Sequence, residues 1–294
     1  MHVFSTFALF FALTLFTTTS WALGKLGHQL VCDIAYQQLS PSKQGEIDAL
    51  LSQLPKNDKK RVNNFNHANV KTPMTYGKAC TWPDVVKNDK PYKAYKKWHY
   101  VNFDRDTTKA KEKACKKDCI TEAIPFHTEQ LNADNTKDKL QALLFLGHWL
   151  GDLHTPMHVS FSSDWGGNKT DIKVDGISCD SMHGLWDVCL LTRQVTGGSL
   201  KTQYLPLWMK LSTVKDTQIQ QWQQGSVTDW ATESLIIARH PNTGYCSVEK
   251  GDVCAERKLP VPLNKAQLDW GSQQLNIRIQ QAATRLAWLL EQHL

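Results

Sequence analysis

A run of residues from Phe145 to His158, FLGHWLGDLHTPMH, combines three histidines and one aspartate with an apolar, helix-like pattern. Within it, His148 and Asp152 are four residues apart, so a helix places them on the same face. Burying imidazole or carboxylate groups without partners costs free energy. These side chains therefore require a ligand or hydrogen-bond partners inside the fold.

The same four-residue spacing recurs downstream in the segment HGLWD, which contains His183 and Asp187. His158 follows Pro156, which ends the preceding helix and lets the chain turn back toward the same cavity. Each pair can present an imidazole nitrogen and a carboxylate oxygen to one cation, and this donor set suits zinc. One such pair alone is more often a salt bridge on the surface, whereas two pairs together with His158 indicate a metal centre.

Further candidate ligands occur toward the N-terminus, in the segments GH, CTWPD and KWHYVN. An α-amino group exposed at Leu23 by proteolytic cleavage would also bind a metal once deprotonated. A catalytic zinc ion normally has three or four protein ligands, so this supply suffices for three zinc ions if one carboxylate is shared. The candidate ligands are Leu23, His28, Asp84, His99, His148, Asp152, His158, His183 and Asp187.

The N-terminal segment has the features of a signal peptide. Its apolar run, residues 4–16, is shorter than the roughly 20 residues that span a bilayer. The small residues Ser20 and Ala22 have the spacing that signal peptidase accepts. We therefore expect a signal peptide at residues 1–22 and a secreted or periplasmic protein, with an uncleaved membrane anchor as the alternative. No later segment is long and apolar enough to span a membrane, so we expect no stable membrane association.

All eight cysteines follow the expected cleavage site. An even number of cysteines in an exported chain indicates disulfide bonds. Cys115 and Cys119 form one plausible local pair. Cys246 and Cys254 form another, and the partners of the remaining cysteines stay open. A structural zinc site is the alternative, but the sequence lacks paired CxxC spacing.

The net charge of +6 is concentrated between Lys87 and Lys117, where lysines alternate with aromatic residues. Basic side chains among aromatic rings suit a single-stranded nucleic acid. On charge alone, a solvated lysine-rich loop is the more common explanation. The aromatic residues concerned are Tyr92, Tyr95, Trp98, Tyr100 and Phe103.

Most of the chain that carries the candidate ligands has the sequence pattern of helices. Ser40 and Pro41 have the pattern of a cap followed by proline at the first helical position. Residues 169–176, KTDIKVDG, alternate as one arm of a short β-hairpin would. We therefore predict an all-α fold, a single mostly helical domain with a short β-hairpin, over residues 23–294. The expected helices are 28–39, 41–51, 121–131, 137–153, 184–196, 200–209, 216–239 and 264–292.

In these motifs the chain resembles the zinc-dependent single-strand nucleases known from fungi as nuclease P-one and nuclease S-one, to which plant bifunctional nucleases are related. The match extends from the expected mature N-terminus to at least Asp187. It rests on the spacing of the candidate ligands on either side of the GGN segment, residues 166–168. The resemblance implies an all-α fold like that of phospholipase C, with three zinc ions at the bottom of a cleft.

The resemblance also implies which residues share each zinc ion. Family members usually begin with the pattern W-G-x-x-G-H, which aligns here with LGKLGH and puts Leu23 in the tryptophan position. Leucine can serve there because the ligands are backbone atoms. His154 matches no ligand position, so we expect it to be a helix-end or supporting residue. The first ion is assigned to Asp84, His99, His148 and Asp152, the second to Leu23, His28 and the bridging Asp152, and the third to His158, His183 and Asp187.

The activity that the resemblance implies is hydrolysis of single-stranded DNA and RNA to 5′-phosphorylated products by a monomeric enzyme. It also implies 3′-nucleotidase activity on 3′-mononucleotides. Asp84 would orient the attacking water, and Lys87 replaces an arginine beside the scissile phosphate. Tyr100 matches an aromatic residue that stacks on the base 5′ of the cut. Asn102 stands where adenine-preferring members have aspartate, and Asn168 lies in the GGN loop that contacts substrate.

Two alternatives to a nuclease remain open. A zinc-dependent phospholipase C has the same fold and three-zinc arrangement, but the aromatic-rich basic stretch and the GGN loop favour the nuclease. A non-catalytic zinc carrier would bind zinc without turnover. Carriers of that kind have flexible histidine-rich loops, whereas the histidines here lie at fixed offsets on helices.

Overall fold

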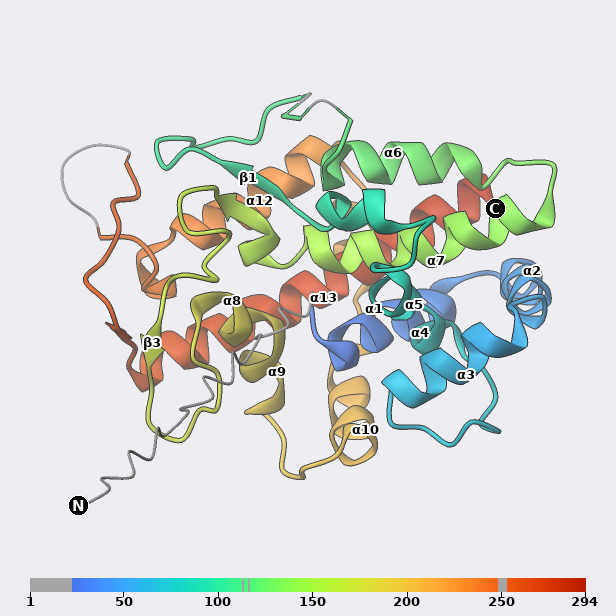
Figure 1. Ribbon diagram of the computed structural model, residues 1–294, viewed down its shortest axis with the longest axis horizontal. Helices are drawn as coiled ribbons and strands as arrows, with labels where there is room; N and C mark the ends of the chain where they lie inside the picture. Colours follow the sequence, from blue (N-terminus) through green and yellow to red (C-terminus); the bar gives the residue numbers. More distant parts are fainter. Residues whose placement is uncertain (1–22, 113, 116, 248–252) are drawn as a thin grey trace, which may run out of the picture.

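A long C-terminal helix, α13 (Lys265–His293), runs across almost the whole width of the molecule (Figure 1). The computed structural model describes residues 23–112, 114–115, 117–247 and 253–294, so the expected signal peptide lies outside the described residues. Helices α1 (Lys25–Gln38) and α7 (Thr136–Leu153) both pack on α13 and on each other. These three helices form the centre of the fold.

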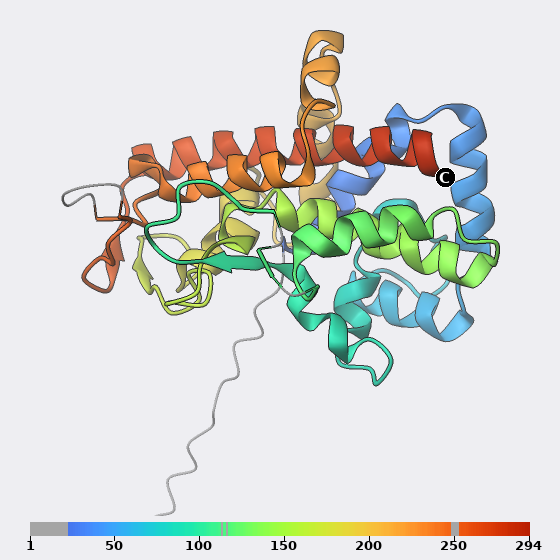
Figure 2. The same cartoon turned by 90° about the horizontal axis from the view of Figure 1, so that it is seen from above.

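Helix α7 is buried on all sides from Ala142 to Leu153, as expected for a helix at the centre of a fold. It begins at Asn135, whose side chain accepts a hydrogen bond from the backbone of Asp138. It ends just before the Thr155-Pro156 step, because proline cannot continue a helix. Helix α6 (Ile120–Gln130) covers one side of α7 (Figure 2).

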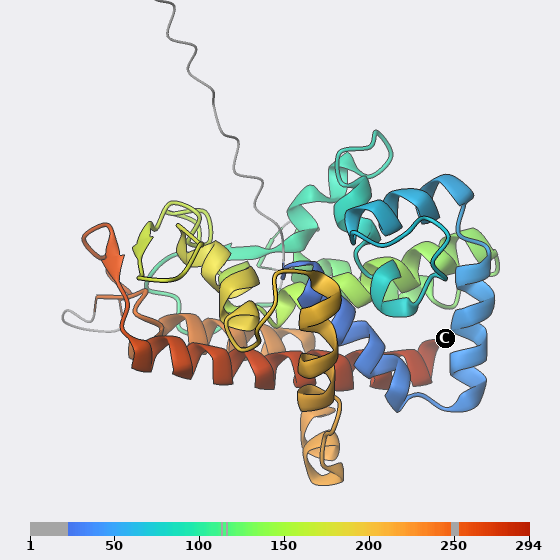
Figure 3. The same cartoon turned by 90° about the horizontal axis from the view of Figure 1, so that it is seen from below.

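The remaining helices surround this centre. Helix α10 projects away from α13, as Figures 2 and 3 show. Among the described helices, none combines the length and apolar character needed to cross a bilayer. The longer surrounding helices are α2 (Pro41–Ser52), α3 (Lys56–Phe65), α10 (Leu200–Leu211), α11 (Asp216–Trp222) and α12 (Val227–Arg239). The short ones are α4 (Tyr76–Ala79), α5 (Trp82–Val86), η1 (Lys93–His99), η2 (Pro156–His158), α8 (Met182–Gly184), η3 (Leu185–Cys189), α9 (Leu190–Thr192) and η4 (Pro241–Thr243).

Four short strands form two parallel pairs in the described chain. Strand β1 (Val101–Phe103) pairs with β2 (Val159–Phe161), so that Val101 lies opposite Val159. Strand β3 (Ile172–Lys173) pairs with β4 (Val261–Pro262), which is distant in sequence. The hairpin expected at residues 169–176 is reduced to one antiparallel bridge between Asp171 and Ser181.

The all-α prediction is confirmed, and most helix boundaries agree within a few residues. The helix expected at 216–239 is two helices, because Gly225 adopts a left-handed backbone (φ +85°) between α11 and α12. Helix α3 was not predicted. Its sequence is almost entirely polar, and Val62 and Asn63 are its only buried residues.

Four disulfide bonds are present, and both predicted local pairs are confirmed. The other two lie around the candidate ligands. Cys32–Cys80 joins α1 to the end of α4, shortly before Asp84, and Cys179–Cys189 encloses the segment with His183 and Asp187. The two sulfur atoms of Cys32–Cys80 lie so close to Gly147 that a Cβ there would be 2.5 Å from one and 2.7 Å from the other. This disulfide therefore packs directly on α7 beside His148.

Candidate metal centre

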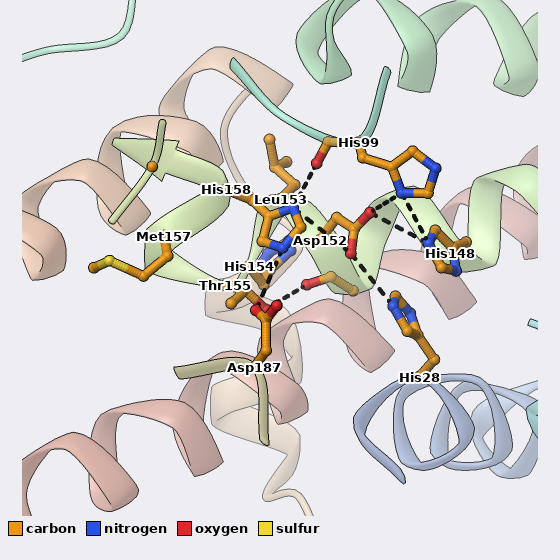
Figure 4. A network of polar contacts seen from close by, with 12 residues as sticks. His28, His99, His148, Asp152, Leu153, His154, Thr155, Met157, His158 and Asp187 are labelled. Atoms are coloured by element: carbon orange, nitrogen blue, oxygen red, sulfur yellow. Dashed lines mark hydrogen bonds and ion pairs between the residues drawn. The ribbon is translucent and has the colours of Figure 1, made fainter. Parts of the chain in front are cut away.

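The candidate histidine and aspartate ligands lie far apart in sequence but come close together in one buried region. Figure 4 shows those around Asp152, together with Asp187. Helix α7 supplies His148 and Asp152 from its buried face, one turn apart, and neighbouring elements supply the other ligands. The exposed fraction of each of these residues is at most 7 %. The other elements are α1 with His28, α5 with Asp84, η1 with His99, η2 with His158, α8 with His183 and η3 with Asp187.

The carboxylate of Asp152 is the central group of this cluster (Figure 4). Its Oδ2 lies 2.9 Å from Nδ1 of His99 and 3.3 Å from Nε2 of His148. Its Oδ1 lies 3.3 Å from Nε2 of His28 and 3.9 Å from Nδ1 of His158. A carboxylate with histidines at both oxygens has the arrangement of a bridging ligand.

A second carboxylate, Asp187, joins two more histidines. Its Oδ1 lies 3.4 Å from Nε2 of His158, and its Oδ2 lies 3.1 Å from Nε2 of His183. The segment that holds Asp187, η3, is a π-helix rather than the α-helix expected at residues 184–196. The two H-x-x-x-D pairs therefore face one cavity region, although only the pair on α7 lies within a regular α-helix.

Several buried atoms of the cluster have no hydrogen-bond partner, although buried polar groups normally have one. They include Nε2 of His28, Oδ1 of Asp152, Nε2 of His158 and both carboxylate oxygens of Asp187. Imidazole nitrogens and carboxylate oxygens are zinc ligands. The donor set therefore fits bound cations. In the described chain, three groups each bring their ligand atoms within 4.8 Å of one another: His28, Asp84 and His148; His99, His148 and Asp152; and His158, His183 and Asp187.

Backbone carbonyl groups fix the orientation of three of the imidazole rings. Nδ1 of His148 lies 2.8 Å from the carbonyl oxygen of Cys80. Nδ1 of His158 lies 2.6 Å from that of His99, and Nδ1 of His183 lies 2.7 Å from that of Gly166. In its neutral form, a ring that donates from Nδ1 presents an unprotonated Nε2, which is how histidine ligands are commonly oriented.

Electrostatics in the cluster favour ionised carboxylates. Burial alone would raise the pKa of Asp152, but His148 and His158 hold it well below its usual value. Burial alone would lower the pKa of His158, but Asp152 and Asp187 raise it to about 9. The cluster therefore attracts a cation, and metal binding at His158 would release a proton.

A cavity of about 430 Å³ opens directly onto the cluster. Tyr100, Asn102 and Asn168, which were predicted to contact substrate, all line it. Lys87 also lines it, and its Nζ lies 3.0 Å from Oδ1 of Asp84. The other lining residues are Lys96, His99, Met157, His158, Trp165, Gly166 and His183.

Leu23 lies against the same cluster, with only 1 % of its surface exposed. The side chain packs so closely on α1 that a Cβ at Gly27 would come within 2.5 Å of it. The next residue, Gly24, donates a backbone hydrogen bond of 2.9 Å to the carbonyl oxygen of Asp187. The expected mature N-terminus is therefore held beside the candidate ligands.

His154 is buried but belongs to a separate polar network. This agrees with the expectation that it is a supporting residue rather than a metal ligand. Its Nδ1 lies 2.8 Å from the carbonyl oxygen of Leu150, and its Nε2 lies 2.7 Å from Nη1 of Arg285. Burial and the neighbouring charges of Arg278 and Arg285 hold the pKa of His154 well below its usual value. Both arginines also bind Glu233 on α12, so the end of α7 is tied to α12 and α13. No pattern in the sequence indicated that these arginines are buried.

We expect Arg285→Met to destabilise the protein by about 3–5 kcal/mol, because removing one member of a buried charge network leaves its partners uncompensated. Arg285 donates to Glu233, His154 and the carbonyl oxygen of Trp222, and 1 % of its side chain is exposed. Urea denaturation measures the change. The matched control is Arg193→Met, since Arg193 pairs with Asp269 on the surface and should contribute at most about 1 kcal/mol. Equal effects of the two substitutions would contradict a structural role for the buried network.

Comparisons with known proteins show the family of this chain. The family model for S1/P1 nuclease matches residues 23–294. Endonuclease 1 of Arabidopsis thaliana is 30 % identical over 198 residues, which cover 63 % of this chain and 57 % of that protein. Nuclease S1 of Aspergillus oryzae is 27 % identical over 253 residues, covering 80 % of this chain and 78 % of that protein. With a family match from Leu23 to the last residue, the chain belongs to the S1/P1 nuclease family.

Proposed function

We propose that this protein is a secreted, zinc-dependent endonuclease that hydrolyses single-stranded DNA and RNA to 5′-phosphorylated products. We also propose 3′-nucleotidase activity and a monomeric enzyme. The observation that carries the proposal is the buried cluster of histidines and carboxylates at the floor of a cavity whose wall includes Tyr100. The names of the relatives, which are endonucleases and nucleases, support the same reaction class.

The cluster would hold three zinc ions, with Asp152 as the shared ligand. When bound, zinc ions lower the pKa of water toward about 7 and stabilise negative charge on phosphate oxygens. Leu23 and His28 would bind the second ion together with Asp152. Because Leu23 would bind through its α-amino group, this ion would depend on cleavage directly before Leu23. The unpartnered oxygens of Asp152 and Asp187 support this assignment.

Asp84 and Lys87 are proposed to act on the reacting groups from the edge of the cluster. The carboxylate of Asp84 is almost fully buried, and Lys87, with 25 % of its side chain exposed, reaches the cavity. Burial alone would raise the pKa of Asp84, but His148 and Lys87 hold it below its usual value. Ionised Asp84 accepts a hydrogen bond from the attacking water and orients it, while the ammonium group of Lys87 binds the scissile phosphate.

Preference for single strands follows from the cavity wall. Tyr100 directly follows His99 in the sequence, and 39 % of this residue is exposed. Stacking on such a ring tolerates any base but requires an exposed base face, which a duplex hides. The amides of Asn102 and Asn168 line the same cavity and can bind base edges or sugar hydroxyls.

The test is a side-by-side assay of the purified protein that begins at Leu23. We expect cleavage of single-stranded DNA and RNA, slower cleavage of the matching duplex, and phosphate release from a 3′-mononucleotide. A chelator should stop all of these reactions and added zinc should restore them. Release of phosphocholine from phosphatidylcholine vesicles without DNA cleavage would indicate a phospholipase C. Zinc binding without turnover of any of these substrates would indicate a carrier.

Substitution of Lys87 tests its contact with phosphate. We expect Lys87→Ala to lower kcat about 100-fold, since it removes one charge that stabilises the transition state. Lys87→Arg should retain most activity because the charge remains and the guanidinium group can bind phosphate through two hydrogen bonds. The measurement is kcat on single-stranded DNA, with zinc content checked in each variant. An alanine variant with normal kcat would show that Lys87 only pairs with Asp84.

A further inference from the structure

A second aromatic ring, Trp165, lies at the same cavity as Tyr100 and has no part in the proposed mechanism so far. The side chain is 63 % exposed and lines the cavity together with Tyr100 and Asn102. Among the tryptophans that the structure describes, Trp165 is the only exposed one, whereas Trp82, Trp149, Trp186 and Trp230 are buried. An exposed indole at a cavity that is proposed to bind bases therefore requires an explanation.

The backbone holds Trp165 in a conformation that an aromatic residue seldom adopts. Its φ angle is +58°, and the following glycines, Gly166 and Gly167, also have positive φ angles. Such strain in non-glycine residues is concentrated at functional sites. The turn is fixed by hydrogen bonds from the Gly166 backbone to the carbonyl oxygen of Phe161 (2.9 Å) and from the Asn168 side chain to that of Trp165 (2.8 Å). The surrounding loop thus imposes the position of the indole.

The two aromatic residues neighbour different groups of candidate ligands. Tyr100 follows His99, whose Nδ1 contacts Oδ2 of Asp152. Trp165 precedes Gly166, whose carbonyl oxygen lies 2.7 Å from Nδ1 of His183. Tyr100 is therefore attached to the His99 group of ligands, and Trp165 is attached to the His158, His183 and Asp187 group.

Strand pairing brings the two segments together. Strands β1 and β2 place Asn102 opposite Ser160, and the turn after β2 folds back onto them. A Cβ at Gly166 would lie 3.6 Å from Oδ1 of Asn102, which is a buried oxygen without a hydrogen-bond partner. An unpartnered polar atom of a cavity-lining residue therefore lies beside the turn that holds Trp165.

One face of the Trp165 ring is occupied. The ammonium group of Lys169 lies 3.7 Å from the ring centroid, a cation–π contact. A planar base can stack on the other face, and the positive charge of Lys169 favours a nearby phosphate. An arrangement of aromatic rings with basic groups is typical of sites for single-stranded nucleic acid.

We infer that Trp165 is a second stacking platform, which binds the base on the opposite side of the scissile phosphate from the base on Tyr100. The inference rests on the proposed nuclease function and adds a specificity determinant to it. A substrate with bases on both sides of the cleaved bond uses both rings. A 3′-mononucleotide has one base and uses Tyr100 alone.

The test compares KM and kcat on a short single-stranded oligonucleotide and on a 3′-mononucleotide. We expect Trp165→Ala to raise KM for the oligonucleotide about 10- to 100-fold, the range for loss of one stacked base. Its kinetics on the mononucleotide should not change. Trp165→Phe should restore oligonucleotide binding, and Trp165→Gly, which suits the left-handed backbone but lacks a ring, should behave like Trp165→Ala. Tyr100→Ala should weaken both substrates, and Phe126→Ala, which removes an aromatic ring that is 43 % exposed outside the cavity, should weaken neither.

Binding of a phosphorothioate oligonucleotide to the zinc-loaded protein gives a readout that does not depend on turnover. Normal oligonucleotide affinity and KM in both Trp165→Ala and Trp165→Gly would overturn the inference. An equal rise of KM for the two substrates would also overturn it, because Trp165 would then contact the same base as Tyr100. Failure of the wild-type protein to cleave either substrate would instead contradict the proposed function, whatever the variants bind.

Discussion

Replacing Asp152 with asparagine is expected to lower kcat by about three orders of magnitude or more, since metal ions contribute several kcal/mol to such reactions. The two oxygens of Asp152 face four histidines, and the side chain is completely buried. An asparagine amide is neutral and presents one oxygen and one NH₂ group, so it cannot bridge two cations. We expect the variant also to lose zinc.

The measurement combines single-turnover cleavage of single-stranded DNA with elemental analysis of the same protein sample. Asp134→Asn is the matched control, because it makes the same chemical change at an exposed position. Zinc content in Asp152→Asn should fall below the proposed three ions per molecule, whereas the control should keep the zinc content of the wild-type protein. Near-normal rates with full zinc content in Asp152→Asn would remove Asp152 from its bridging role.

The central part of the site could be predicted because helix geometry alone determines it. The spacing of His148 and Asp152 places both on one face of α7, and the apolar residues around them predict that the face is buried. The same reasoning related His183 to Asp187, although the backbone there is partly π-helical. The four-residue spacing along the sequence therefore identified these two pairs without knowledge of the tertiary fold.

Other parts of the site have no such local period. Asp84 and His99 lie on the short elements α5 and η1, and tertiary packing rather than sequence spacing brings them to α7. Their side chains made them candidate ligands, but only the resemblance assigned them to the same ion as His148 and Asp152. Trp165 was not identified, because its role depends on a left-handed turn that sequence patterns do not predict for tryptophan. Its position directly before the GGN segment was the one available signal.

Parallel pairing explains the error at residues 169–176. Alternating residues predict a strand but do not identify its partner, and the partner of β3 is β4, near the start of α13. Disulfide pairing was likewise predictable only between cysteines that are close in sequence. Pairs close in sequence could be proposed, whereas Cys32–Cys80 depends on the contact between α1 and α4. The partners of β3 and of Cys32 could not be predicted because both depend on contacts between segments that are distant in the sequence.

A single additional residue ahead of Leu23 is expected to lower activity at least about 100-fold, more than loss of a typical supporting contact. Leu23 is buried beside α1 and α7, and Gly24 is bonded to the backbone of Asp187. An extra residue converts the proposed metal-binding amine into an amide, which is a poor ligand. We therefore expect zinc content to fall from three ions to two.

The best comparison uses one protein before and after cleavage. A removable N-terminal tag is placed so that proteolysis exposes Leu23, and activity and zinc content are measured on both forms in the presence of zinc. Activity should appear only after cleavage, while an equal extension beyond Leu294 should have no effect. If residues 1–22 are the signal peptide that we expect, a precursor that still carries them would lack the proposed nuclease activity until they are removed. Full activity and three zinc ions in the uncleaved form would exclude Leu23 from the ligands and leave His28 and Asp152 to hold that ion with other donors.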